Sequence, residues 1–105
     1  MLIRFKRENN ELIAFLDGEI DHHNASFARR EIDSELNCDP PERFLLDFAG
    51  VSFMDSSGIG LAMGRYKLCL GLKIGFGIVN VPENIYKVMK LAGLVRLCEI
   101  KRKEG

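Results

Sequence analysis

The sequence predicts an α/β fold: a mixed, mostly parallel β-sheet with an N-terminal β-hairpin and about three to four helices. Two observations support this prediction. The chain opens with two short apolar runs separated by a polar turn, and from there on segments with strand and helix patterns alternate. Such alternation is typical of right-handed crossovers, which set parallel strands side by side and cover them with helices.

The opening hairpin is expected to pair residues 2–6 with residues 12–16 across the polar turn at residues 8–11. The second run is continuously apolar, which predicts that it is the more buried strand, and Gly18 is expected to break the pattern. A helix is predicted over residues 24–36, because one face carries apolar residues at helical spacing: Ala25, Ala28, Ile32 and Leu36.

The middle of the chain is expected to form a strand and then a helix. The strand covers residues 43–48, is bounded by Gly50, and residues 51–54 run onward to the next junction. The helix covers residues 57–70, with Gly71 at the place where a left-handed cap would fall. Helical spacing assigns this helix the following apolar face: Ile59, Ala62, Met63, Tyr66 and Leu70.

The last third of the chain repeats the pattern. A buried strand is predicted over residues 73–79, and a helix over residues 82–93 with Pro82 at its first position and Gly93 at its end. A short strand over residues 97–100 and a polar tail complete the expected fold. Most of the seven phenylalanines are expected in the core.

The composition predicts one globular domain over residues 1–105. Hydrophobic residues make up 47% and charged residues 29%, and a chain of this length can bury a core without disulfides. Its 15 Lys and Arg balance its 15 Asp and Glu, which argues against a dedicated nucleic-acid binder. No apolar run approaches the ~20 residues that cross a bilayer, and the first residues carry charges where a signal peptide is apolar, so a cytoplasmic location is expected.

The acidic residues are concentrated in the first half of the chain. Residues 1–55 carry six Lys and Arg against twelve Asp and Glu, and the acidic stretch Asp17-Gly-Glu-Ile-Asp21 within them is a candidate docking site for a basic partner.

Cys38, Cys69 and Cys98 are widely spaced and odd in number. This pattern favours buried or half-buried free thiols over a disulfide framework or a structural zinc site.

Ser56 follows a predicted buried strand and precedes a glycine-rich helix start. A helix start has unpaired backbone N–H groups and partial positive charge, so it can cradle an anion, including a phosphate carried by a serine. Asp55, Ser56 and Ser57 are all capping residue types, and an ordinary helix cap is the alternative interpretation. Gly58 and Gly60 leave the first turn without bulk, so another protein could approach closely.

Asp21-His22-His23 forms a second polar cluster. It could be a metal or acid–base site, but adjacent histidines point in different directions and no third ligand has useful spacing. A polar segment that caps the next helix is the favoured interpretation. A Ser–His–Asp triad with Ser56 is disfavoured because the sequence lacks a Gly-x-Ser-x-Gly elbow. We therefore expect no catalytic residue and no metal site.

Three segments occur in order along the chain: Gly18-Glu-Ile-Asp-His-His23, Phe53-Met-Asp-Ser-Ser-Gly-Ile-Gly60 and Gly64-Arg-Tyr-Lys67. Together they resemble the bacterial anti-sigma factor antagonists, which are single STAS domains (sulfate transporter and anti-sigma factor antagonist). The serine motif is typical of the antagonist class, and the Gly-Glu-x-Asp-His-His form points to its sporulation branch, the antagonists of the anti-sigma F factor. The resemblance spans nearly the whole chain in element order and implies a STAS-type fold.

The resemblance implies that Ser56, the first serine of the Asp-Ser-Ser-Gly motif, is phosphorylated by a partner anti-sigma factor that is itself a serine kinase. The unphosphorylated form would bind this kinase and free the sigma factor, and a serine phosphatase would reset the phosphorylated form. The acid of Gly-Glu-x-Asp, here Asp21, would meet a basic residue of the kinase. The other candidate partner-binding residues are Glu19, His22, Asp55, Ser57, Gly58 and Gly60.

The resemblance also implies a non-enzymatic protein without a cofactor, with no direct contact to nucleic acid or membrane, and monomeric until it forms hetero-complexes. Two further functions stay open. A general-stress-type antagonist of another sigma factor would share the serine motif, and a small anion- or nucleotide-binding module would use the helix start for a free ligand. An enzyme that depends on His22, His23 or Ser56 is a third alternative.

Overall fold

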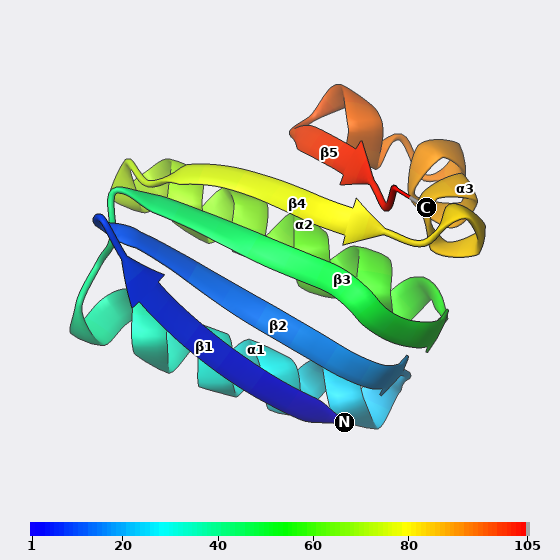
Figure 1. Cartoon of the computed structure of the whole chain (residues 1–105), viewed down its shortest axis with the longest axis horizontal. Helices are drawn as coiled ribbons and strands as arrows, with labels where there is room; N and C mark the ends of the chain where they lie inside the picture. The colour runs from blue at the N-terminus through cyan, green and yellow to red at the C-terminus, as the bar shows by residue number, and fades with distance from the viewer. Residues whose placement is uncertain (105) are drawn as a thin grey trace.

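Residues 1–104, the part of the chain that the computed structural model describes, form a five-stranded sheet, three α-helices and one 3-10 turn (Figure 1). The strands lie across the sheet in chain order: β1 (Leu2–Glu8), β2 (Glu11–Ile20), β3 (Arg43–Met54), β4 (Gly75–Val81) and β5 (Glu99–Arg102). The helical segments are α1 (His22–Cys38), α2 (Ser56–Leu72), α3 (Glu83–Leu91) and the turn η1 (Leu94–Arg96). β1 is antiparallel to β2 and the later pairs are parallel, which confirms the predicted sheet with its N-terminal hairpin.

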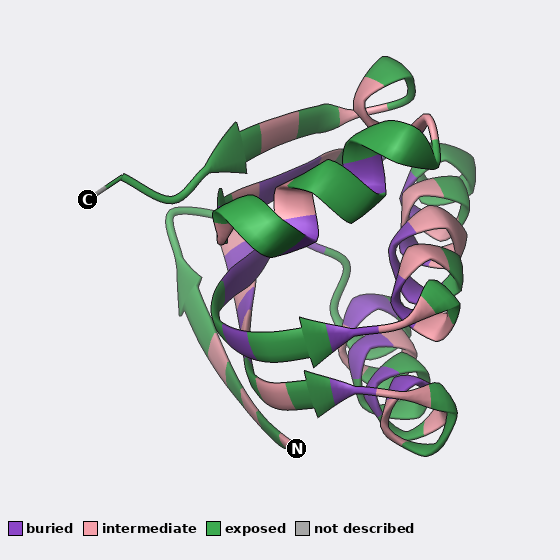
Figure 2. Cartoon of the chain, turned by 90° about the vertical axis from the view of Figure 1, so that its right-hand side faces the viewer, coloured by how far each residue is buried: buried purple, intermediate pink, exposed green. Residues whose placement is uncertain are grey.

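The helices α1 and α2 cover the same face of the sheet, and α3 lies at the end of β4 (Figures 1 and 2). The predicted apolar face of α1 is confirmed, since its buried residues are those expected. They belong to one core cluster with the inward side chains of β2 and β3: Leu12, Ala14, Leu16, Phe44, Leu46 and Phe48. Burying each large apolar side chain of this kind contributes about 1.5–3 kcal/mol to stability. Within residues 1–104 no helix is long and apolar enough to cross a membrane.

The hairpin is longer than predicted. Asn9 and Asn10 have positive φ angles of 53° and 64°, which suits a two-residue turn between Glu8 and Glu11. The predicted end of the second strand at residue 16 is wrong, because β2 continues to Ile20. The expected break in the pattern at Gly18 is present within the strand. Gly18 has a φ of 112° and lies at an irregularity in the pairing with β3, where glycine permits a backbone shape that side chains resist.

The predicted apolar face of α2 is only partly correct. Ala62 is buried and Ile59 and Met63 pack against the core, but Leu70 is 64% exposed. The buried residues of the helix also include positions that the prediction left out: Gly58, Leu61, Arg65 and Cys69. The helix carries apolar residues on all sides, so their spacing does not define one face, and a buried arginine is not anticipated by such a pattern. The left-handed cap is Lys73, with a φ of 61°, and not Gly71, since the helix continues to Leu72.

The C-terminal elements are shifted from their predicted bounds. Pro82 is the N-cap residue of α3 and not its first helical residue. Gly93, with a φ of 81°, ends this region and starts η1, whose Leu94 is fully buried. Because this turn occupies the next residues, β5 begins at Glu99 and takes in part of the predicted polar tail.

The three cysteines are free thiols. Burial raises the pKa of the Cys69 thiol to about 11, because the low-dielectric core disfavours the thiolate. The half-buried Cys98 thiol also has its pKa raised by burial. Cys38 is exposed at the end of α1, so the expectation of burial is wrong for this residue.

Candidate functional site: two helix starts at one edge of the sheet

The strands β2 and β3 run parallel and end side by side. Ile20 pairs with Met54, and the backbone N–H of Asp55 donates a hydrogen bond to the carbonyl of Ile20 at 3.1 Å. Each strand is followed directly by a helix, α1 after Asp21 and α2 after Asp55. Two helix N-termini, each with partial positive charge, therefore begin at the same edge of the sheet.

Both junctions are capped by an aspartate in an extended conformation. Oδ1 of Asp55 accepts a hydrogen bond from the backbone N–H of Ser57 at 2.8 Å. Oδ1 of Asp21 accepts one from the backbone N–H of Asn24, also at 2.8 Å. The predicted capping role of these residues is confirmed, and the two carboxylates are held in place by the backbone they cap.

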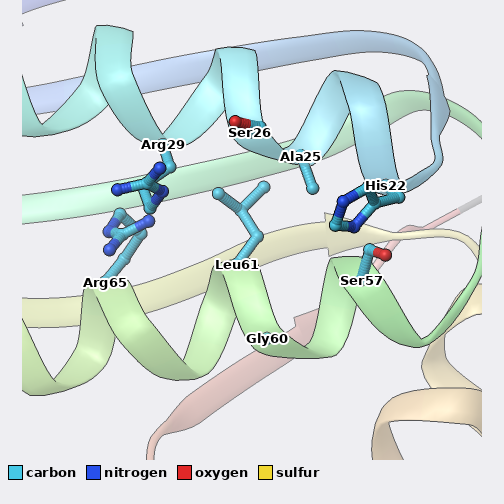
Figure 3. Close-up of a pocket in the computed structure, with 8 residues that line it drawn as sticks. All are labelled: His22, Ala25, Ser26, Arg29, Ser57, Gly60, Leu61 and Arg65. Atoms are coloured by element: carbon cyan, nitrogen blue, oxygen red, sulfur yellow. The ribbon is translucent and has the colours of Figure 1, made fainter.

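Ser56 and Ser57 have different surroundings. Ser56 is the first residue of α2 and is exposed, so its hydroxyl is open to a visiting protein. Ser57 is half-buried and faces His22 of α1 (Figure 3). The predicted position of Ser56 at a strand-to-helix junction is confirmed, and of the two serines it is the accessible one.

The two glycines of the first turn differ as well. Gly58 is buried, and a Cβ placed on it would lie 2.1 Å from Cγ and 2.4 Å from Sδ of Met54. Its missing side chain therefore serves packing inside the domain and leaves no opening for a partner. Gly60 is exposed and has no neighbouring atom within 4 Å of its Cβ position. Of these two glycines, Gly60 is therefore the one that another protein could approach closely.

The acidic stretch Asp17–Asp21 lies alongside residues 50–55, as the pairing of β2 with β3 requires. Asp17 and Glu19 are exposed, and Asp21 is half-buried. The acidic stretch therefore runs beside the strand end that leads into Ser56.

Phe53 is a surface residue that the sequence interpretation missed. It pairs with Glu19 and is 49% exposed, although most phenylalanines were expected in the core. The signal was available, since Phe53 precedes the buried Met54 and adjacent residues of a strand face opposite sides. Its exposed ring stands at the strand position opposite Glu19 of the acidic stretch.

A groove of about 280 Å³ separates α1 from α2. Its lining residues come from both helices: His22, Ala25, Ser26, Arg29, Ser57, Gly60, Leu61 and Arg65 (Figure 3). His22 and Ser57 face each other at one end, while Arg29 and Arg65 meet at the other. The carboxylate of Asp21 caps α1 and does not orient His22. Asp21, His22 and Ser56 therefore lack the geometry of a Ser–His–Asp catalytic triad. In the part of the chain that the structure describes, no three His, Cys, Asp or Glu side chains are grouped to hold a metal ion.

The sequence matches the STAS domain family over residues 3–105. The chain belongs to this family. This STAS domain is 30% identical to the anti-sigma F factor antagonist of Paenibacillus polymyxa, over 93% of this chain and 84% of the relative. It is 26% identical to the anti-sigma-B factor antagonist of Listeria monocytogenes, over 95% of this chain and 87% of that protein.

Solved structures give the same fold. The unphosphorylated form of the anti-sigma factor antagonist SpoIIAA superposes with a TM-score of 0.81 at 25% identity, covering 94% of this chain and 87% of that chain. The phosphorylated form of Bacillus SpoIIAA superposes with a TM-score of 0.73, again at 25% identity, covering 94% of this chain and 90% of that chain. The resemblance to the antagonists of the anti-sigma F factor and the predicted STAS-type fold are both confirmed.

Proposed function

We propose that this STAS domain is an anti-sigma factor antagonist that is switched by phosphorylation of Ser56. Its unphosphorylated form binds an anti-sigma factor serine kinase and so releases a sigma factor, which we take to be the sporulation factor sigma F. The observation that carries the proposal is the exposed Ser56 hydroxyl at the first position of α2, beside the acidic stretch. The relatives named as antagonists, and a SpoIIAA structure in a phosphorylated form, support it.

The fold tolerates a phosphate at this position. Phosphoserine carries about −1.5 to −2 charges at neutral pH, and the N-terminal end of a helix favours negative charge. The partner's binding surface does not tolerate it, because that surface fits a neutral hydroxyl. After phosphorylation it would meet a bulky dianion next to Asp55 and the acidic stretch, and mismatched charge at an interface costs several kcal/mol. The phosphate therefore acts on the partner and leaves the domain folded.

The acidic surface of the site supplies the attraction in the unphosphorylated state. Asp21 is held by its cap hydrogen bond, and the exposed Glu19 adds a second negative charge close by. We assign Asp21 the contact with a basic residue of the kinase. Asp21→Asn keeps an oxygen that can accept the Asn24 hydrogen bond but loses the charge. We therefore expect this variant to keep its stability and to bind the kinase more weakly.

The direct test is ATP-dependent phosphorylation by the anti-sigma factor kinase of the same organism, with the modified residue located by mass spectrometry. The wild-type domain and Ser57→Ala should each gain one phosphate, at Ser56. Ser56→Ala should gain none and should stay bound to the kinase in the presence of ATP. Full modification of Ser56→Ala would remove Ser56 from the mechanism.

The remaining assignments follow from the same proposal. The domain is a non-enzymatic cytoplasmic monomer that forms hetero-complexes, and a serine phosphatase regenerates its active form. A general-stress antagonist is the second candidate, because the Listeria anti-sigma-B factor antagonist aligns with 95% of the chain. Binding measured side by side with an anti-sigma F and an anti-sigma B kinase distinguishes the two functions.

A further inference from the structure

The strand β3 lies between two neighbouring strands over only part of its length. Residues 43–47 pair with both β2 and β4, whereas the residues after Asp47 have strand partners only in β2. Beyond this point β3 and β4 separate (Figure 1). Among residues 1–104, residues 49–53 therefore have no strand on the side from which β4 has departed, and we call this side the free edge of β3.

A buried carboxylate fixes the point at which the two strands separate. Oδ2 of Asp47 accepts a hydrogen bond from Nδ2 of Asn80 on β4 at 2.8 Å, and Oδ1 accepts one from the backbone N–H of Ala49 at 2.9 Å. Asn80 has a positive φ of 55°, which interrupts the regular extended backbone of β4. The free edge is therefore set by contacts on both strands and is present before any partner binds.

The free edge is accessible and lacks the residues that usually protect a sheet edge. Ala49, Gly50, Ser52 and Phe53 are exposed, and the exposure of Gly50 is exposure of its backbone, because glycine has no side chain. Natural edge strands carry charges or proline that discourage pairing with another chain. The outer strands β1 and β5 carry such charges, whereas residues 48–54 contain neither a charge nor a proline. Of these edges, the free edge of β3 is the one suited to receive a strand from another protein.

We propose that the free edge of β3 binds an extended segment of the anti-sigma factor kinase as an added strand, an inference that rests on the proposed function. Backbone N–H and C=O groups supply the attraction in such a contact, and side chains on alternate positions supply the specificity. The small side chains of Ala49 and Ser52 let the added strand approach, and the exposed ring of Phe53 offers it an apolar contact. Because the edge carries no charge, we expect the bound segment to be uncharged and apolar.

The position of the free edge favours the kinase as its occupant. Ser52 lies four residues before Ser56, so their Cα atoms are at most about 14 Å apart. A protein interface covers about 800 Å² on each partner, which corresponds to a disc with a radius of about 16 Å. A kinase surface centred on the Ser56 hydroxyl therefore extends as far as the free edge.

The test is amide hydrogen exchange of the full chain, alone and in complex with the kinase. The exposed amides of residues 49–53 are expected to exchange quickly in the free domain and at least about tenfold more slowly in the complex, because strand addition gives them hydrogen-bond acceptors. The amides of β1, at the far edge of the sheet, should exchange at the same rate in both states. A complex that forms without protecting residues 49–53 would overturn this inference and leave the proposed function standing. A wild-type domain that binds no anti-sigma factor kinase would overturn both.

Three variants separate strand addition from general charge attraction. Ser52→Lys and Ser52→Glu each place a charge at the free edge, and each should weaken kinase binding by about tenfold, because either charge is desolvated when a strand pairs there. Ser34→Lys is the matched control on the exposed surface of α1 and should bind as the wild type does. Tighter binding by Ser52→Glu, or equal binding by Ser52→Lys and Ser34→Lys, would overturn the inference.

Discussion

The junctions at the ends of β2 and β3 are built alike but present different chemistry to solvent. Each strand ends on a buried apolar residue, and an extended aspartate then accepts a backbone hydrogen bond of 2.8 Å and starts a helix. At the first junction the helix opens with the exposed His22 and His23. At the second it opens with the exposed Ser56, followed by the half-buried Ser57 and the buried Gly58.

The residues that start each helix differ from the residues that distinguish the two junctions. The aspartate caps are common to both junctions, so they account for the helix starts and not for a switch. The small residues occur at only one. Gly58 brings α2 against the end of β3, and Ser56 exposes its hydroxyl. Under the proposed function, phosphorylation adds a reversible negative charge at the second junction while the first stays as a constant binding surface.

The largest expected effect is on the packing that distinguishes the second junction. Gly58→Ala should lower the free energy of unfolding by about 1–3 kcal/mol, because the new Cβ collides with the buried side chain of Met54. Gly60→Ala is the matched control and should be neutral or stabilising by up to about 1 kcal/mol, since its Cβ meets open space. Urea unfolding followed by circular dichroism measures both. Equal effects of the two variants would show that Gly58 is not a packing requirement.

A smaller effect, similar at both junctions, is expected from the caps. Asp21→Ala and Asp55→Ala should each cost about 1 kcal/mol of stability, because each leaves a backbone N–H without its acceptor. The corresponding Asn variants should retain most of the stability, since an amide oxygen can accept the same bond. A loss with Asn as large as with Ala would mean that the charge, and not the cap, stabilises the junction.

The smallest effect is expected from negative charge at Ser56. Ser56→Asp should change the free energy of unfolding by no more than about 1 kcal/mol, with an increase favoured by the partial positive charge of the helix start. Thermal unfolding of the variant beside the wild type provides the measurement. A clear loss of stability would indicate that phosphorylation acts by unfolding the start of α2.

The parts of the fold that sequence predicted best are those with one dominant signal. The face of α1 is defined by four apolar residues among polar ones, and both aspartate caps stand at the ends of apolar runs. The face of α2 is predicted only in part, because apolar residues surround that helix. The burial of Arg65 is not anticipated by this pattern, and its contact with Asp33 on α1 explains its position. The groove between α1 and α2 depends on how two helices that are separate in the sequence pack together. Local sequence patterns do not predict this packing.

The central claim is that one phosphate at Ser56 changes partner affinity without changing the fold. The most direct measurement is calorimetric binding of the anti-sigma factor kinase to the unphosphorylated and the Ser56-phosphorylated domain, together with the melting temperature of each form. We expect phosphorylation to weaken binding by about 100-fold, since a few kcal/mol of lost complementarity corresponds to that factor, and to leave the melting temperature unchanged or slightly raised. Equal affinity of the two forms, or unfolding of the phosphorylated form, would contradict the account.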